Sequence, residues 1–126
     1  MKKIILIFVF IVAIIGTGYG ILPKLSLLGL AGKIQEIVLT DRGFQPASII
    51  IKQNTRVSFL NKGSKPHWPA SDFHPTHGIY PEFDPQVEVP PGKTWEFVFS
   101  KVGKLKYHDH LEPENKGIVI VNLREK

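Results

Sequence analysis

Residues 94–110 read TWEFVFSKVGKLKYHDH, and this stretch defines two neighbouring strands joined by a tight turn. In residues 94–100 an aromatic side chain occupies every second position, which is typical of a strand with one face on a hydrophobic core. Gly103 tolerates the positive φ that such a turn requires. Residues 104–110 then form the next strand. The stretch therefore indicates a β fold.

The same pattern extends over the rest of residues 33–126. Short β-type runs alternate with turn signals at residues 41–43, 90–92 and 101–103, each of which includes a glycine. No helical period is sustained in this region. About seven short strands in roughly 95 residues are typical of an all-β sandwich. The expected strands are residues 34–40, 47–52, 55–61, 86–89, 94–100, 104–110 and 117–123.

Residues 62–85 break the strand pattern. They include five of the ten prolines and show no alternation, so they are predicted to form a long connection between two strands. Connections of this length inside a compact domain are usually functional or disordered. Four aromatic residues give this one its own apolar anchors, which predicts an ordered loop packed on one end of the sandwich. These anchors are Trp68, Phe73, Tyr80 and Phe83.

The N-terminus has a different composition. Residues 4–15, IILIFVFIVAII, have no polar side chain, and the apolar run continues to residue 22. About 20 residues at ~1.5 Å each suffice to cross a bilayer. We therefore expect three regions: a signal anchor with one transmembrane helix (residues 1–22), a linker (23–32) and one β-sandwich domain (33–126).

The charges that flank the apolar run predict its orientation. Lys2 and Lys3 precede it, and positive residues stay on the cytoplasmic side. The protein is therefore expected to cross the cell membrane once, through residues 4–22, with its domain on the extracytoplasmic side. A cleaved secretory signal is the alternative, in which case the domain is secreted. No clean A-x-A cleavage site follows the run, which favours the uncleaved anchor.

Charge and sulfur content exclude several functions. The chain has a formal charge of +5, but from residue 33 onward 13 basic residues are balanced by 11 acidic ones, so the domain has no nucleic-acid-binding footprint. The chain has no cysteine, and its single methionine is Met1. Disulfides, thiolate zinc sites, iron–sulfur clusters and soft sulfur ligands are therefore excluded. Nucleophilic hydrolysis and nucleotide binding are also unsupported, because the chain has no G-x-S-x-G motif and no phosphate-binding glycine loop.

Two of the five histidines end the strand 104–110. His108 and His110 are two residues apart, so their side chains are expected on one face, with Tyr107 and Asp109 on the other. The sequence leaves this register open. If Tyr107 and Asp109 instead point into the site, His108 becomes peripheral.

The other three histidines, His67, His74 and His77, lie in the long connection. Because a sandwich gathers its loops at its ends, both groups are expected to meet in a site of about three to five imidazoles that binds a metal without sulfur. The expected ligands are His67, His77, His108 and His110, with His74 as a fifth. The alternative is that the histidines only stabilise loops through hydrogen bonds. Candidate oxygen ligands, or acceptors that orient the rings, are Asp72, Glu82, Asp84 and Asp109.

Several motifs follow one another in a recognisable order: Phe44-x-Pro46, IIIK at residues 49–52, TRVSFLN at 55–61, Pro66-His67, Pro90-Pro91-Gly92, and YHDHL at 107–111 leading through Pro113 to KGIVIV at 116–121. This layout resembles that of cupredoxin-like domains. The resemblance spans nearly all of residues 33–124, and it rests on order and spacing more than on any single motif. It implies an all-β, Greek-key cupredoxin-like sandwich that binds copper.

The last loop departs from the family pattern. In cupredoxin-like domains this loop commonly reads YHCxLHPxMxG and carries three ligands of a blue copper centre, which fall here on Asp109, Glu112 and Asn115. Of the blue copper ligands, only the early histidine, His67, is retained. A site of imidazoles lacks the copper–thiolate bond and favours Cu(II) over Cu(I). The HDH triplet at 108–110 also looks like the HCH of multicopper oxidases, but the other HxH pairs of their copper cluster are absent.

The favoured hypothesis is a membrane-tethered, extracytoplasmic protein that binds, delivers or sequesters copper. Its partners would be the metal ion and an envelope protein that donates or accepts it. Zinc is the alternative ion, although the Irving–Williams order favours Cu(II) at nitrogen sites. A mononuclear copper redox enzyme or an electron-transfer protein is the second hypothesis, and no catalytic residue is assigned. A metal-free envelope interaction domain is the third.

Overall fold

The structure is a computed structural model that describes residues 34–125 as a β-sandwich. The all-β fold predicted from the sequence is confirmed. The strands are β1 (Gln35–Thr40), β2 (Gly43–Gln45), β3 (Ser48–Lys52), β4 (Thr55–Asn61), β5 (Pro69–Ser71), β6 (Thr94–Phe99), β7 (Gly103–Asp109) and β8 (Lys116–Asn122).

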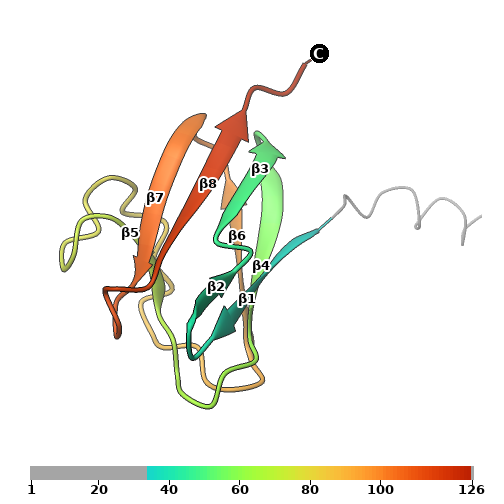
Figure 1. The fold of residues 1–126 in the computed structure, drawn as a ribbon. Helices are drawn as coiled ribbons and strands as arrows, with labels where there is room; N and C mark the ends of the chain where they lie inside the picture. Colours follow the sequence, from blue (N-terminus) through green and yellow to red (C-terminus); the bar gives the residue numbers. More distant parts are fainter. Residues whose placement is uncertain (1–33, 126) are drawn as a thin grey trace, which may run out of the picture. The chain divides into compact units, whose positions relative to one another are not determined.

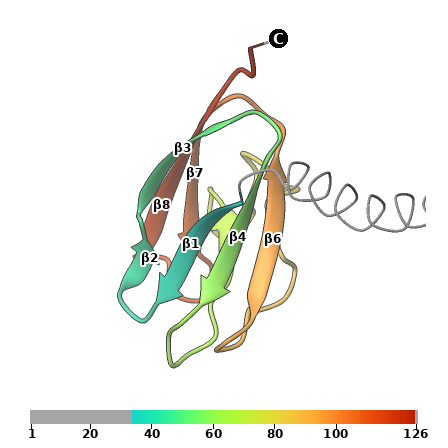
Figure 2. The ribbon, with the colours of Figure 1, turned by 90° about the vertical axis from the view of Figure 1, so that its right-hand side faces the viewer.

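Two four-stranded sheets form the two layers of the sandwich (Figures 1 and 2). One sheet has the strand order β2-β1-β4-β6, and the other has the order β3-β8-β7-β5. β1 pairs in parallel with β4, and β3 pairs in parallel with β8, whereas the other strand pairs are antiparallel. Because many neighbours within a sheet are not consecutive in the sequence, the chain crosses from one sheet to the other, as Greek-key connections do.

Most expected strands agree with the observed bounds to within one residue. Residues 86–89 are the exception, because Gln86 has a positive φ of 58° and only Val89 pairs, in an isolated bridge with His67. The sequence also misses β2 and β5, since three residues are too few to show an alternating pattern. β5 therefore divides the connection expected over residues 62–85.

The three predicted turns are confirmed. Gly43, Gly92 and Gly103 all adopt positive φ, with values of 115°, 77° and 134°. Residues with a side chain rarely adopt such angles, so glycine sets the strand ends at these turns. The last of them starts β7, the strand that leads to the histidines.

Aromatic side chains fill the space between the sheets. Phe59 on β4 packs against Phe83 and Tyr107, with ring centroids 5.5 Å and 5.9 Å apart. Tyr107 on β7 lies opposite Gly117 on β8, where the Cβ of any other residue would overlap the tyrosine ring. This packing fixes β7 against the core, and with it the face that each neighbouring residue of β7 presents.

The segment after β5 packs beside the edge where β5 pairs with β7 (yellow in Figure 1). Tyr80 and Phe83 are buried in the core, as expected of anchors. Phe73 is not an anchor, because its side chain is 68% exposed, and the prediction is wrong for this residue. Asp72 N donates to Lys106 O at 3.1 Å, which attaches the start of the segment to β7.

The predicted transmembrane helix, residues 4–22, and the linker, residues 23–32, lie outside the described residues. Within residues 34–125 no helix is long and apolar enough to cross a membrane. The membrane anchor remains a prediction from the sequence.

Candidate metal centre

The five candidate histidines separate into two groups. Four of them form a group that we call the histidine cluster: His74, His77, His108 and His110. One ring nitrogen from each lies within 4.8 Å of the other three. His67 lies apart, beside Asp109 and Glu112. The grouping thus differs from the expected set of four metal ligands, which included His67 and left His74 as the fifth ligand.

The alternation of β7 determines where its last residues point. Tyr107 enters the core, and Asp109 is fully buried beside His67. His108 and His110 both join the histidine cluster, with ring centroids 6.4 Å apart. The expected alternation is therefore observed: His108 and His110 share one face, whereas Asp109 points to the other face, toward His67.

The loop after β5 brings the other two histidines to β7. Ile79 N donates to Asp72 O at 2.8 Å, so the loop doubles back onto its own start. His77 adopts a left-handed φ of 53° within this turn. The rings of His74 and His77 consequently lie against His108, with centroids 5.2 Å and 5.4 Å away.

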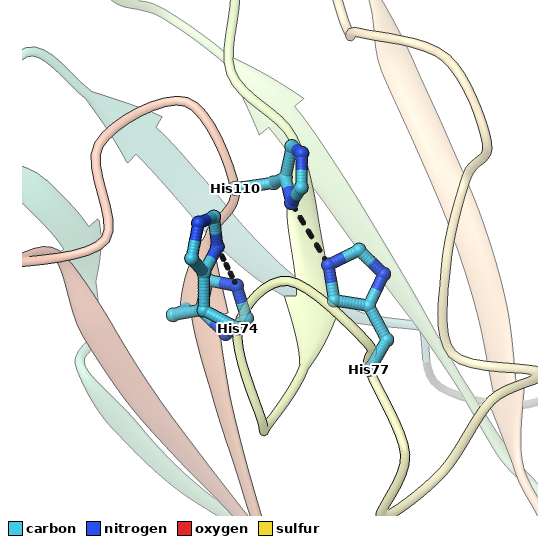
Figure 3. A group of neighbouring side chains, drawn as sticks. His74, His77 and His110 are labelled. Atoms are coloured by element: carbon cyan, nitrogen blue, oxygen red, sulfur yellow. Dashed lines mark hydrogen bonds between the residues drawn. The ribbon is translucent and has the colours of Figure 1, made fainter.

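The rings converge in pairs (Figure 3). His77 Nε2 lies 2.9 Å from His110 Nδ1, and His74 Nδ1 lies 3.2 Å from His108 Nε2. Four nitrogens around one ion at bond lengths of ~2.0–2.1 Å are about 3.3–3.4 Å apart in a tetrahedron. These two separations are close to that value, and all four nitrogens lie within 4.8 Å of one another. His77 and His108 are buried and His74 is exposed, so the cluster opens to solvent on the His74 side.

Two carboxylates orient the buried rings. Asp84 Oδ2 lies 2.7 Å from His77 Nδ1, and Asp72 Oδ1 lies 3.0 Å from His108 Nδ1. An ionised carboxylate only accepts hydrogen bonds, so Nδ1 of each ring carries the proton and the Nε2 lone pair faces the cluster. Metal-binding histidines are commonly held in this way. Glu82, the other loop carboxylate, pairs with an exposed lysine instead.

Trp68 supports two members of the cluster. Its ring packs on His110 with centroids 4.9 Å apart, and its Nε1 donates to Asp84 Oδ1 at 2.8 Å. Since Asp84 holds His77, a displacement of Trp68 would disturb two rings. The sequence identifies Trp68 only as a loop anchor, because no local pattern signals contacts with residues so far along the chain.

Burial favours the neutral form of the two histidines at the end of β7. It lowers the pKa of His108, although the hydrogen bond that His108 Nδ1 donates to Asp72 acts in the opposite direction. It also lowers the pKa of His110, where nearby imidazoles act in the same direction. For Asp84, burial alone would raise the pKa, but hydrogen bonds from Gln86 N and two side chains outweigh it and hold the pKa below its ordinary value. Neutral imidazoles are the form that binds a metal ion.

His67 belongs to a second group of side chains. Its Nδ1 lies 2.5 Å from Asp109 Oδ2, and the two side chains are only 1% and 0% exposed. Glu112 pairs with Lys65 and accepts a hydrogen bond of 3.1 Å from Asn115 Nδ2. We call these five residues the His67 network. It holds all four positions at which the resemblance expects blue copper ligands.

The residues of the His67 network do not fit a blue copper centre. None supplies sulfur, so a copper–thiolate bond has no donor. Both oxygens of Asp109 already accept hydrogen bonds, Oδ1 from the backbone N of Trp68 and Leu111, and Oδ2 from His67. The Lys65 ammonium beside Glu112 also repels a cation. A cupredoxin-type copper site at this position is therefore not supported by the side chains present.

This chain belongs to the cupredoxin-like domain family. The model of that family matches residues 6–121, which is most of the chain. The resemblance stated from the motifs is thereby confirmed. A search of curated proteins gives no match.

Solved structures of cupredoxins share the fold at low sequence identity. A Cu(I) structure of an amicyanin variant is 17% identical, with a TM-score of 0.60 over 74% of this chain and 86% of that chain. A purple cupredoxin from Nitrosopumilus maritimus is 23% identical, with a TM-score of 0.55 over 70% of this chain and 99% of that chain. These similarities establish the sandwich.

A copper-containing nitrite reductase from Thermus scotoductus SA-01 is also similar. It is 21% identical, with a TM-score of 0.65 over 76% of this chain but only 24% of that chain. The present chain thus corresponds to one part of that longer enzyme, and the likeness concerns the fold alone.

Proposed function

We propose that this protein binds one copper ion, with Cu(II) preferred, through the histidine cluster. Its role would be to bind, deliver or sequester copper outside the cytoplasm, while residues 4–22 tether it to the membrane. The observation that carries the proposal is the convergence of four imidazole nitrogens, two of them on rings held by carboxylates.

The charge of the site supports a divalent cation. In the form that binds a metal the imidazoles are neutral, so the carboxylates of Asp72 and Asp84 give the site a charge of about −2, which a divalent ion neutralises. Without a metal, each nitrogen pair shares one proton in a hydrogen bond between two rings. The positive charge of a metal ion would instead satisfy all four nitrogens and both carboxylates together.

Copper is preferred over zinc for two reasons. The Irving–Williams order places Cu(II) above Zn(II) at nitrogen sites, and a site of imidazoles suits Cu(II) better than Cu(I). Two of the structural relatives also contain copper: the amicyanin variant, in its Cu(I) form, and the nitrite reductase. Zinc remains the rival ion, because it accepts the same imidazoles in a tetrahedral arrangement.

A copper redox enzyme is the second candidate, and the exposure of His74 favours it. Catalysis at a metal needs a coordination position that a small substrate can reach, and the open side of the cluster would provide one. Electron transfer of the blue copper type is not proposed, because it depends on a thiolate. Oxygen consumption or superoxide dismutation by the copper-loaded protein would distinguish an enzyme from a carrier.

The proposal is tested by electron paramagnetic resonance of the full chain in detergent, loaded with one equivalent of Cu(II). The expected spectrum shows nitrogen couplings from imidazoles, and His77→Ala and His110→Ala lose affinity by more than the about 10–100-fold typical of residues that only support a ligand. Glu82→Gln is the matched control in the same loop and should behave as wild type. A spectrum of free aqueous copper, or unchanged copper affinity in both histidine variants, would contradict the proposal.

Thermal unfolding distinguishes a metal-binding protein from the metal-free alternative. A ligand that binds the native state stabilises it by RT ln(1 + [L]/Kd), about 2.7 kcal/mol at a hundredfold excess over Kd. A melting temperature that responds to neither copper, zinc nor chelator would instead favour an interaction domain without a metal.

A further inference from the structure

The His67 network and the histidine cluster share one short stretch of chain. Asp109 belongs to the network, and it stands between His108 and His110 of the cluster. Alternation on β7 sends the Asp109 side chain inward and its two neighbours outward. Whatever fixes Asp109 therefore also fixes the backbone from which both histidines project.

Asp109 is fixed by three hydrogen bonds in a fully buried position. Its Oδ2 is bonded to His67 Nδ1, and its Oδ1 accepts from Trp68 N at 2.9 Å and from Leu111 N at 3.1 Å. His110 N donates to Trp68 O at 2.8 Å, which adds a backbone bond between the same segments. Several hydrogen bonds thus join residues 67–68 to residues 109–111.

Trp68 extends this connection to the loop. Its backbone N is held by Asp109, its ring packs on His110, and its indole Nε1 binds the Asp84 carboxylate that orients His77. A shift of Asp109 would therefore reach His108 and His110 through the strand, and His77 through Trp68.

We propose that the His67 network, which occupies the positions expected of blue copper ligands, holds the histidine cluster in place on the other face of β7. His67 and Asp109 act as positioning residues, and they bind no metal themselves. The inference rests on the proposed function of the histidine cluster.

The test changes His67, because removal of the Asp109 carboxylate would also leave the backbone N–H groups of Trp68 and Leu111 without their acceptor. His67→Ala removes the donor to Asp109. His67→Asn is the conservative variant, since its amide nitrogen occupies about the place of Nδ1 and can still donate. Each full-length variant is titrated with copper against a chelator, and its paramagnetic resonance spectrum is recorded at one equivalent.

His67→Ala should still bind one copper ion, but about 10–100-fold more weakly and with an altered or heterogeneous spectrum, as expected when a supporting residue is lost. His67→Asn should restore the affinity and spectrum of the wild type. If His67→Ala does not fold, His67→Gln gives the same comparison, because it fills a similar volume but places its amide nitrogen near the Nε2 position.

The other outcomes overturn the inference. A folded His67→Ala protein with wild-type affinity and spectrum would show that the network positions nothing. Equal losses in His67→Ala and His67→Asn would make His67 a metal ligand, as would a second bound copper that disappears in both. These results would contradict the inference but not the proposed copper site in the histidine cluster. If the wild-type chain binds no copper, both the proposed function and the inference are wrong.

Discussion

At the scale of single residues, the carboxylates beside the histidines matter as much as the rings. Asp84 and Asp72 accept from the Nδ1 atoms of His77 and His108, and they leave the Nε2 atoms free of protons. A carboxylate in this place both selects the tautomer and raises the basicity of the ligand. The affinity for copper should therefore depend on residues that never touch the ion.

Asp84→Asn tests this dependence. Asparagine has a single acceptor oxygen, and Trp68 Nε1 and Gln86 N both donate at the Oδ1 position, so the amide nitrogen would face His77 Nδ1. An amide nitrogen donates and does not accept, so the His77 ring would lose its orientation or change its tautomer. Copper affinity measured by chelator competition should fall about 10–100-fold. Glu82→Gln, in the same loop, should leave it unchanged, because Glu82 pairs with Lys101 outside the cluster. An Asp84→Asn protein with wild-type affinity would show that the carboxylate is dispensable.

The lowered pKa values of His108 and His110 predict how the metal-free protein responds to acid. A histidine whose pKa is lower in the folded state binds protons more readily when unfolded, so its contribution to stability is complete above the ordinary pKa of about 6.5 and is lost as the pH falls toward the lowered value. Thermal unfolding in chelator should therefore show a loss of stability as the pH falls below about 6.5. The loss should be smaller in His110→Gln. An equal or larger loss in that variant would contradict the assignment.

At the scale of elements, β7 is the strand on which the site depends. Its alternation could be predicted from the sequence, as could the pairing of His108 with His110 on one face. The separation of His67 from the other histidines could not, because it depends on Asp109 accepting three hydrogen bonds inside the sandwich. β5 also escaped prediction, since its three residues, Pro69–Ser71, resemble the loop around them.

The loop histidines illustrate the same limit. The sequence shows that His74 and His77 are close along the chain, but only the turn that brings Ile79 back to Asp72 sets them against His108. Tyr80 and Phe83 could be predicted as anchors from their apolar character. Phe73 has the same character and is exposed, because burial depends on which side of the loop meets the sandwich.

Trp68 gives a spectroscopic test of how the loop and β7 meet. Its ring lies 4.9 Å from that of His110, whereas Trp95 lies on β6 in the other sheet. Because Cu(II) quenches indole fluorescence at short range, copper should quench Trp68 strongly. Most of the quenching should disappear in Trp68→Phe and persist in Trp95→Phe. The opposite pattern would place the bound copper elsewhere.

Gly117→Ala tests the packing that holds β7 in register. The new Cβ would overlap the Tyr107 ring between the sheets, and such overpacking typically costs about 1–3 kcal/mol. Denaturant unfolding should show that the free energy of unfolding falls by this amount. Gly78→Ala is the matched control, because its Cβ would meet only Thr76 Oγ1 at 3.6 Å, an ordinary contact. If the two variants have equal free energies of unfolding, β7 accommodates the added methyl group without loss of stability.

At the scale of the whole molecule, the chain combines the cupredoxin-like sandwich with side chains that do not fit a blue copper centre. The positions of the blue copper ligands hold hydrogen-bonded and ion-paired side chains, and the imidazoles gather on the other face of β7. The fold could be predicted from the order of its motifs. The site could be predicted only as a set of candidates, because a single inward residue, Asp109, divides them into two groups.

A crystal structure of the protein grown with copper, with anomalous scattering measured at the copper edge, would locate the bound ion. We expect one copper peak bonded to ring nitrogens of the histidine cluster, with His67 still bonded to Asp109, because the histidine cluster is the proposed copper site. A peak between His67, Asp109 and Glu112, or no peak at either place, would contradict it.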